Sequence, residues 1–224
     1  TNIDYDHPDA YPDLLAVQQA FIALQKQSKF TFICADDEAS SVLRSADNVV
    51  TFGLSEKLNE LKLQIPGRHN MLNAAAAIAA CERIGIAWEI VKRGLERFGG
   101  TKRRFEKLGE LRGALIYDDY AHHPTQIKAT LSAARARFPK KRIIAVFQPH
   151  TFSRTKALFE EFSQCFKSAD LVIITKIYAS AREKDDPTIS SQMLVNNLLK
   201  NQKNVIYLET LDKVVEYLKI NLKP

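Results

Sequence analysis

The stretch ALIYDDYAHHP at residues 114–124 decides the fold, because a short apolar strand gives way there to a polar loop and then to a helix. The stretch IIAVFQPHTFSR at residues 143–154 repeats this arrangement further along the chain. In an open α/β sheet the carboxyl ends of parallel strands line the ligand crevice. We therefore expect the acids, histidines and arginine of both stretches to form a binding site at one edge of a sheet.

Strand and helix patterns alternate four times after residue 100. The expected strands cover residues 114–117, 142–147, 171–175 and 205–208, and the expected helices cover residues 125–138, a segment containing Leu158 to Phe166, 189–199 and 211–218. Such alternation favours a parallel sheet flanked by helices. We therefore predict an α/β fold in which residues 100–224 form a Rossmann-like, mostly parallel sheet.

The first 99 residues show a more mixed pattern. We expect helices at residues 12–26, 70–84 and 87–98 and short strands at 30–34 and 49–52. Gly85 is placed to end the alanine-rich helix before it. The segment GGTKRR at residues 99–104 then breaks the pattern with two glycines and three cations. We predict a domain boundary and a hinge there, which gives domains at residues 1–99 and 100–224.

Composition sets broad limits. With 224 residues, 46% hydrophobic and 26% charged, the chain can bury a core. No apolar run approaches the roughly 20 residues that span a bilayer, so we expect a cytoplasmic protein without a membrane partner. Three cysteines without C-x-x-C spacing argue against a disulfide framework and a zinc site. The net charge of +6 suits anionic small ligands as well as nucleic acid, and nothing indicates the oligomeric state.

Five motifs occur in a fixed order along the chain. They are TNIDYDHPD at 1–9, GRHNMLNAAA at 67–76, RRFE at 103–106, DDYAHHP at 118–124 and FQPHTFSRT at 147–155. Together they closely resemble the Mur ligases, and within them the branch that joins L-alanine to UDP-N-acetylmuramate. The resemblance implies that residues 1–99 are the carboxy-terminal portion of an α/β ATP-binding domain. It also implies that residues 100–224 are the carboxy-terminal Mur ligase domain, which binds the amino acid and the ATP ribose.

The resemblance implies an ATP-dependent ligation in peptidoglycan precursor synthesis. ATP, with Mg²⁺, converts the lactyl carboxylate of UDP-N-acetylmuramate to an acyl phosphate, which the amino group of L-alanine attacks. Charge on the transferring phosphoryl group requires cations in a site that excludes water. No G-x-x-x-x-G-K-[ST] phosphate loop occurs in the 224 residues. The resemblance therefore implies a fragment, inactive alone, that begins inside the central domain and stops before a final strand.

His7 resembles the family histidine that helps to hold Mg²⁺. Magnesium prefers oxygen ligands, so the sequence by itself would favour Asp4, Asp6 or Asp9. The alternative is a cluster of capping and turn residues in front of the next helix. We expect His7 to be the metal ligand, and a metal or structural role for Asp4 remains open.

The resemblance places ATP contacts on both domains. His69, Asn70 and Asn73 stand at the start of the alanine-rich helix, and the resemblance assigns them to ATP binding, the two asparagines at its adenine end. The alternative is a helix N-cap alone. Arg104 resembles the arginine that reaches the ATP phosphate, and we expect it to be catalytic. Asp119 resembles the carboxylate that binds the ribose hydroxyls, and its alternative role is a cap for the following helix.

The resemblance places the L-alanine pocket in the second domain. Tyr120, His123, His150 and Arg154 are the expected pocket residues, with His123 and Arg154 catalytic. An arginine and a histidine can bind the alanine carboxylate while the amine stays free to attack. His122 receives a structural role, because an isolated histidine is more often structural than functional.

Two other functions remain open. A related Mur ligase could add a different amino acid or a peptide, although the block at residues 147–155 favours alanine. A non-catalytic binding module, for nucleic acid for example, would suit the net charge of +6. Nucleic-acid binders tend to carry aromatic residues interleaved with a basic face, and the chain lacks that pattern. We therefore expect no nucleic-acid partner.

Overall fold

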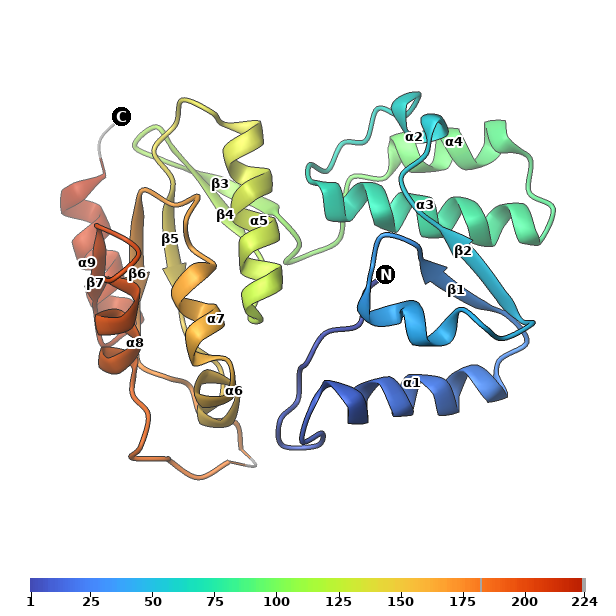
Figure 1. Cartoon of the computed structure of the whole chain (residues 1–224). Coiled ribbons are helices and arrows are strands. Elements are labelled where there is room, and N and C mark those ends of the chain that lie inside the picture. The colour runs from blue at the N-terminus through green and yellow to red at the C-terminus, as the bar shows by residue number, and fades with distance from the viewer. Residues whose placement is uncertain (182, 223–224) are drawn as a thin grey trace. The chain divides into compact units, whose positions relative to one another are not determined.

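The structure is a computed structural model that describes residues 1–181 and 183–222 (Figure 1). The chain divides into two compact units, Thr1–Gly99 and Gly100–Pro224. Within the described residues, no helix is long and apolar enough to cross a membrane. The architecture is α/β in both units, as predicted.

The first unit contains two short strands among helices. In chain order its elements are α1 (Leu14–Gln27), β1 (Thr31–Cys34), the 3₁₀ helix η1 (Ala39–Leu43), β2 (Val49–Phe52), α2 (Glu56–Asn59), α3 (Arg68–Arg83) and α4 (Trp88–Arg97). The hydrophobic patterns predicted the strands and the three longer helices to within a few residues. The two short helices, η1 and α2, were not predicted.

Strands β1 and β2 pair in parallel and are covered on both faces, with α1 on one side and α3 on the other (Figure 1). Neighbouring side chains of a strand point to opposite faces. Ile33 accordingly packs with Val17 of α1 and with Leu43. Cys34, the next residue, packs with Phe52 and with the alanines of α3. The alternation makes this unit a three-layer α/β arrangement.

Gly85 ends α3, as the sequence predicts. The backbone N–H of Gly85 donates to the carbonyl of Glu82 (3.0 Å), and that of Ile86 donates to the carbonyl of Cys81 (2.9 Å). This pair of bonds is a Schellman motif, which requires a left-handed residue after the helix. Gly85 has φ of +80°, a conformation that glycine adopts without a Cβ clash.

The second unit contains the remaining elements. They are β3 (Glu106–Leu111), β4 (Ala114–Asp118), α5 (Pro124–Arg137), β5 (Ile144–Phe147), α6 (Phe152–Ala157), α7 (Phe159–Gln164), β6 (Leu171–Ile174), α8 (Ser191–Leu198), β7 (Val205–Tyr207) and α9 (Leu211–Asn221). Strands β5, β6 and β7 form a parallel sheet in that order. The parallel sheet of the prediction is therefore present for three of its four strands.

The fourth predicted strand, β4, pairs differently. It forms an antiparallel hairpin with β3, a strand that was not predicted because its sequence EKLGEL is charged and largely exposed. Arg112 (φ +50°) and Gly113 (φ +80°) form the two-residue turn. Two residues with positive φ suit the right-handed twist of a hairpin. Arginine at the first of these positions carries no recognisable turn signal.

The core of the second unit lies around β6, whose four residues are all buried. Leu171 and Ile173 pack with Val214 of α9, so this helix covers one face of the sheet. Val172 and Ile174 point to the opposite face by strand alternation. The expected helix containing Leu158 to Phe166 is interrupted, because Leu158 separates α6 from α7 and α7 ends at Gln164.

Candidate functional site

Asp119 joins two loops of the second unit at the end of β4. Its Oδ2 accepts the backbone N–H of Phe105 (2.8 Å), and its Oδ1 accepts that of Ala121 (2.8 Å). The backbone N–H of Tyr120 donates to the carbonyl of Arg103 (2.7 Å). The segment after the predicted hinge is thus attached to the end of β4. Each carboxylate oxygen keeps a second lone pair for a ligand.

Cationic side chains gather around Tyr120. The guanidinium carbon of Arg103 lies 4.7 Å from the centre of the Tyr120 ring, and that of Arg104 lies 5.5 Å from it. Arg103 also pairs with Asp118 (3.4 Å). An aromatic face attracts cations at these distances. Arg104, Asp119 and Tyr120, three of the predicted site residues, therefore occupy one small region.

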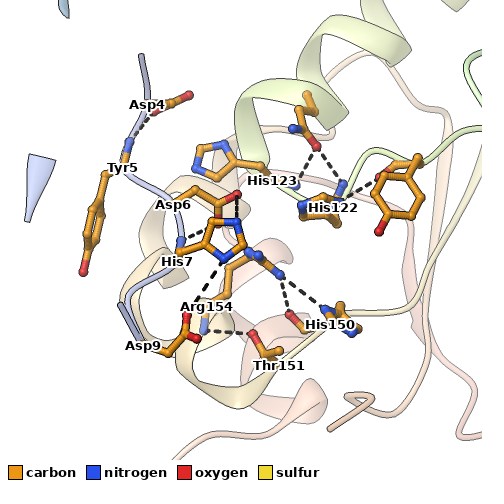
Figure 2. A network of polar contacts seen from close by, with 12 residues as sticks. Asp4, Tyr5, Asp6, His7, Asp9, His122, His123, His150, Thr151 and Arg154 are labelled. Carbon is orange, nitrogen blue, oxygen red and sulfur yellow. Dashed lines mark hydrogen bonds and ion pairs between the residues drawn. The ribbon is translucent and has the colours of Figure 1, made fainter. Parts of the chain in front are cut away.

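His123 is the N-cap of α5. Its Nδ1 accepts the backbone N–H of Thr125 (3.3 Å). In return, the side-chain oxygen of Gln126 accepts the backbone N–H groups of His123 and His122. These reciprocal contacts form a capping box (Figure 2). The alternative role of Asp119 as the cap of this helix is therefore wrong. His122 Nδ1 lies 2.9 Å from the carbonyl of Tyr120, which agrees with its structural assignment.

The second polar stretch lies at the end of β5. Thr151 is the N-cap of α6, and its hydroxyl accepts the backbone N–H of Arg154 (3.3 Å). The φ of Thr151 is +72°, a strained conformation for a β-branched residue. Arg154 is buried. Its Nη1 donates to the carbonyl of His150 (3.2 Å) and lies 3.4 Å from Nδ1 of the same residue (Figure 2).

A loop that the sequence did not implicate holds this stretch. Glu183 accepts the backbone N–H groups of Phe152 and Ser153, each at 2.7 Å. The backbone carbonyl of Tyr178 accepts the N–H of Thr151 (2.9 Å). The ring of Tyr178 stacks on that of His150, with the ring centroids 5.7 Å apart. These partners are about 30 residues away in a polar loop without a motif. No local spacing could have revealed them.

The surroundings of Glu183 and His150 shift their pKa values. Burial raises the pKa of Glu183, but the hydrogen bonds from Ser153 and Phe152 outweigh it and lower the pKa below its usual value. Burial, the Arg154 charge and His122 lower the pKa of His150, against the opposing effect of Glu183. The lowered pKa favours the neutral form of the His150 ring. The charge of His122, which follows β4, acts on His150, which follows β5, and Figure 2 shows both histidines in one view.

The predicted ATP residues of the first unit lie at the start of α3. The N-cap is Gly67, with φ of +105° and no capping side chain, so capping does not explain the residues that follow. Asn70 donates to the carbonyl of Pro66 (2.7 Å), and the amide of Asn73 lies 3.4 Å from the Asn70 side chain. His69 lies in the same first turn.

The start of α3 is close to the carboxyl ends of β1 and β2. Asp36 follows β1, and its carboxylate accepts the backbone N–H of Leu54, which follows β2 (3.2 Å). The same carboxylate lies 3.6 Å from the guanidinium of Arg68, the first residue of α3. In parallel sheets this edge is where ligands bind. The first unit thus places its ATP candidates close to the carboxyl edge of its parallel sheet.

His7 lies in the opening loop with φ of +58°. Its ring nitrogens are 3.9 Å from Asp6 and 4.0 Å from Asp9, and its carbonyl accepts the N–H of Ala10 (2.8 Å) and of Tyr11 (2.9 Å) (Figure 2). Across residues 1–181 and 183–222, no group of three or more His, Cys, Asp or Glu side chains could hold a metal ion. These residues do not form a complete Mg²⁺ site by themselves.

Comparison with known proteins identifies the family. A sequence profile described as Mur ligase, glutamate ligase domain matches residues 103–224. The chain belongs to the Mur ligase family. UDP-N-acetylmuramate–L-alanine ligase from Desulfitobacterium hafniense is 42% identical over 100% of this chain and 56% of its own length. The corresponding ligase from Acetivibrio thermocellus is 41% identical over 100% of this chain and 54% of its own length.

Solved structures of Mur ligases share the fold. The UDP-N-acetylmuramate-alanine ligase MurC from Thermotoga maritima aligns with a TM-score of 0.70 at 27% identity, covering 94% of this chain and 50% of that one. MurF from Acinetobacter baumannii aligns with a TM-score of 0.71 over 98% of this chain and 51% of its own, but at 15% identity it supports the fold alone. This Mur ligase chain spans about half the length of its curated relatives.

Proposed function

We propose that this chain is the carboxy-terminal part of a UDP-N-acetylmuramate–L-alanine ligase that acts in cytoplasmic peptidoglycan precursor synthesis. The observation that carries the proposal is the 42% identity to a ligase of that name over the whole of this chain, both units included. The polar edges of the two units supply the residue types that the reaction needs. The substrates are then UDP-N-acetylmuramate, L-alanine and ATP.

ATP, bound with Mg²⁺, supplies the phosphoryl group that converts the carboxylate of UDP-N-acetylmuramate to an acyl phosphate. In this chain, His69, Asn70 and Asn73 bind ATP from the start of α3. The guanidinium of Arg104 stabilises phosphate charge. Asp119 accepts hydrogen bonds from the ribose hydroxyls with the lone pairs that its backbone contacts leave available.

We assign the L-alanine pocket to the end of β5 and the loop after β4. Arg154 binds the alanine carboxylate, because a guanidinium fork matches a carboxylate with two parallel hydrogen bonds. Tyr120 and His123 limit the size of the pocket and orient the amine. His150, whose Nδ1 lies 3.4 Å from Nη1 of Arg154, lines the same pocket.

His7 is proposed as one ligand of the magnesium ion, which would need oxygen ligands in addition. A single imidazole is a weak site for an ion that prefers oxygen. The carboxylates of Asp6 and Asp9, each about 4 Å from its ring nitrogens, add negative charge nearby. None of the assignments to the alanine pocket depends on this ion.

The amino-acid substrate is the part of the proposal that an assay can test most directly. The complete gene product that contains this chain would receive UDP-N-acetylmuramate, ATP and one of L-alanine, glycine, L-serine or a tripeptide. We expect the highest kcat/KM for L-alanine, since a pocket lined by Tyr120 and His123 favours a small side chain. A preference for the tripeptide or for another amino acid would assign the chain to a different Mur ligase.

A further inference from the structure

A basic depression lies at the opposite end of the parallel sheet from the proposed alanine pocket. It has a volume of about 370 Å³, and its lining residues are Arg135, Lys140, Lys141, Arg142, Asp170 and Asn204. Arg142, Asp170 and Asn204 come just before β5, β6 and β7 respectively. The depression therefore sits at the amino ends of three strands, whereas His150 and Arg154 follow the carboxyl end of β5.

The walls of the depression are fixed by hydrogen bonds. Arg135 donates to the carbonyls of Lys141 (2.8 Å) and Ser168 (3.1 Å) and to the carboxylate of Asp170 (2.6 Å). The same Asp170 oxygen accepts the backbone N–H of Ile143 (2.7 Å). Asn204 donates to the Asp170 carbonyl (3.0 Å), which joins the third strand to the other two. The loop that carries the lysines is thus held in place.

The charges of the depression are unbalanced. Four cationic residues and one carboxylate line it, a net charge of +3, which equals half of the net charge of +6 of the whole chain. Asp170 is already paired with Arg135. Lys140, Lys141 and Arg142 are exposed, and none has an ion-pair partner within the described part of the chain. Like charges held together repel, and a bound anion relieves that repulsion.

We propose that this depression binds a small polyanion that carries a chain of phosphate groups. Several phosphates in a row can contact the three consecutive cations at once, whereas a single carboxylate cannot. The lining contains no aromatic residue on which a base could stack. Recognition therefore rests on the phosphate charges. Free inorganic polyphosphate and the phosphate chain of a nucleotide share this chemistry.

The test uses the 224-residue chain and sodium tripolyphosphate, with binding followed by NMR chemical-shift changes of backbone amides. We expect shifts at residues 140–143, 168–171 and 203–205. The triple variant Lys140→Gln, Lys141→Gln, Arg142→Gln should weaken binding at least about fivefold, since each exposed ion pair contributes modestly. The control Lys107→Gln, Lys128→Gln, Lys184→Gln removes the same charge from exposed positions outside the depression and should bind normally.

Additional measurements identify the source of the phosphates. If ATP produces the same shifts at residues 140–143, the depression accepts the phosphate chain of a nucleotide. If only tripolyphosphate produces them, free polyphosphate is the ligand. Either result supports the site. Raising the salt concentration from 0.05 to 0.5 M should weaken binding markedly. The proposal is overturned if no shifts occur in the depression, or if both triple variants weaken binding equally. Much tighter binding of a single-stranded oligonucleotide would replace it with a nucleic-acid surface.

Discussion

At the scale of single residues, Asp119 combines a proposed ligand contact with a structural one. Its two oxygens hold the backbone of Phe105 and Ala121. In the complete enzyme, Asp119→Ala should raise the KM for ATP by about tenfold to a hundredfold, because a lost hydrogen bond costs about 1–3 kcal/mol. The variant should also unfold at a lower temperature. Asp119→Asn keeps an oxygen acceptor and should be milder in both assays. An unchanged KM and turnover for Asp119→Ala would refute the ribose assignment.

Arg154 allows a test that separates the amino acid from ATP. Arg154→Lys keeps the positive charge but loses the planar fork, so we expect the KM for alanine to rise by about ten- to a thousandfold with little change in the KM for ATP. Lys156→Arg, in the same helix and paired with Asp186 at 3.1 Å, is the matched control and should behave as the parent. If the KM rises only for ATP, Arg154 belongs to the phosphate site. If neither KM changes, its role is structural.

At the scale of elements, Glu183 holds the first turn of α6. We expect Glu183→Gln to lower Tm by about 2–6 °C at pH 7 and to speed hydrogen exchange of the Phe152 and Ser153 amides, because charge-assisted hydrogen bonds are lost. Glu161→Gln, an exposed acid of α7, is the control. Similar exchange rates in the parent and the Glu183 variant would show that the contact does not stabilise the turn.

The lowered pKa of Glu183 gives this contact a pH dependence. A carboxyl group whose pKa is depressed by folding contributes stability above its unfolded value, near 4.5, and loses it as the pH falls through the folded value. The difference in Tm between the parent and Glu183→Gln should therefore be largest above about pH 4.5 and shrink as the pH falls below it. A difference that stays constant from pH 7 to pH 3 would contradict the ionised state of Glu183.

Two glycines of the first unit should respond oppositely to the same change. Gly85→Ala forces a Cβ into the left-handed region and should lower Tm by about 2–8 °C, because that conformation costs about 1–2 kcal/mol. Gly94→Ala lies inside α4, where the new Cβ meets nothing within 4 Å beyond its chain neighbours and the backbone of the helix, and should raise Tm by a few °C. Thermal unfolding of both variants tests this expectation. An unchanged Tm for Gly85→Ala would show that the left-handed conformation at the end of α3 does not require glycine.

The elements also show which parts of the fold the sequence can predict. Periodic apolar residues located the longer helices and the strands β1, β2, β4, β5, β6 and β7. Strand β3 was missed because it is charged, and its hairpin turn at Arg112 carries no usual signal. The site residues of the second unit were predicted to lie together, but their supports, Glu183 and Tyr178, were not. These supports act across about 30 residues, and such tertiary contacts leave no local pattern.

At the scale of the whole molecule, the two units, and the two ends of one sheet, carry different proposed tasks. The first unit presents ATP candidates at the start of α3. The second unit presents the proposed alanine pocket at the carboxyl ends of its strands and a basic depression at their amino ends. The 224 residues contain no Gly-Lys-Ser/Thr phosphate loop, so we expect them to lack ligase activity alone.

The most direct test of the ligase assignment measures UDP-N-acetylmuramoyl-L-alanine by mass spectrometry. The 224-residue chain and the complete gene product that contains it would be incubated side by side with ATP, Mg²⁺, L-alanine and UDP-N-acetylmuramate. We predict that the complete protein forms the product with equal amounts of ADP and phosphate, and that the isolated chain forms none. The absence of product from the folded complete protein, or steady product formation by the isolated chain, would contradict the ligase assignment.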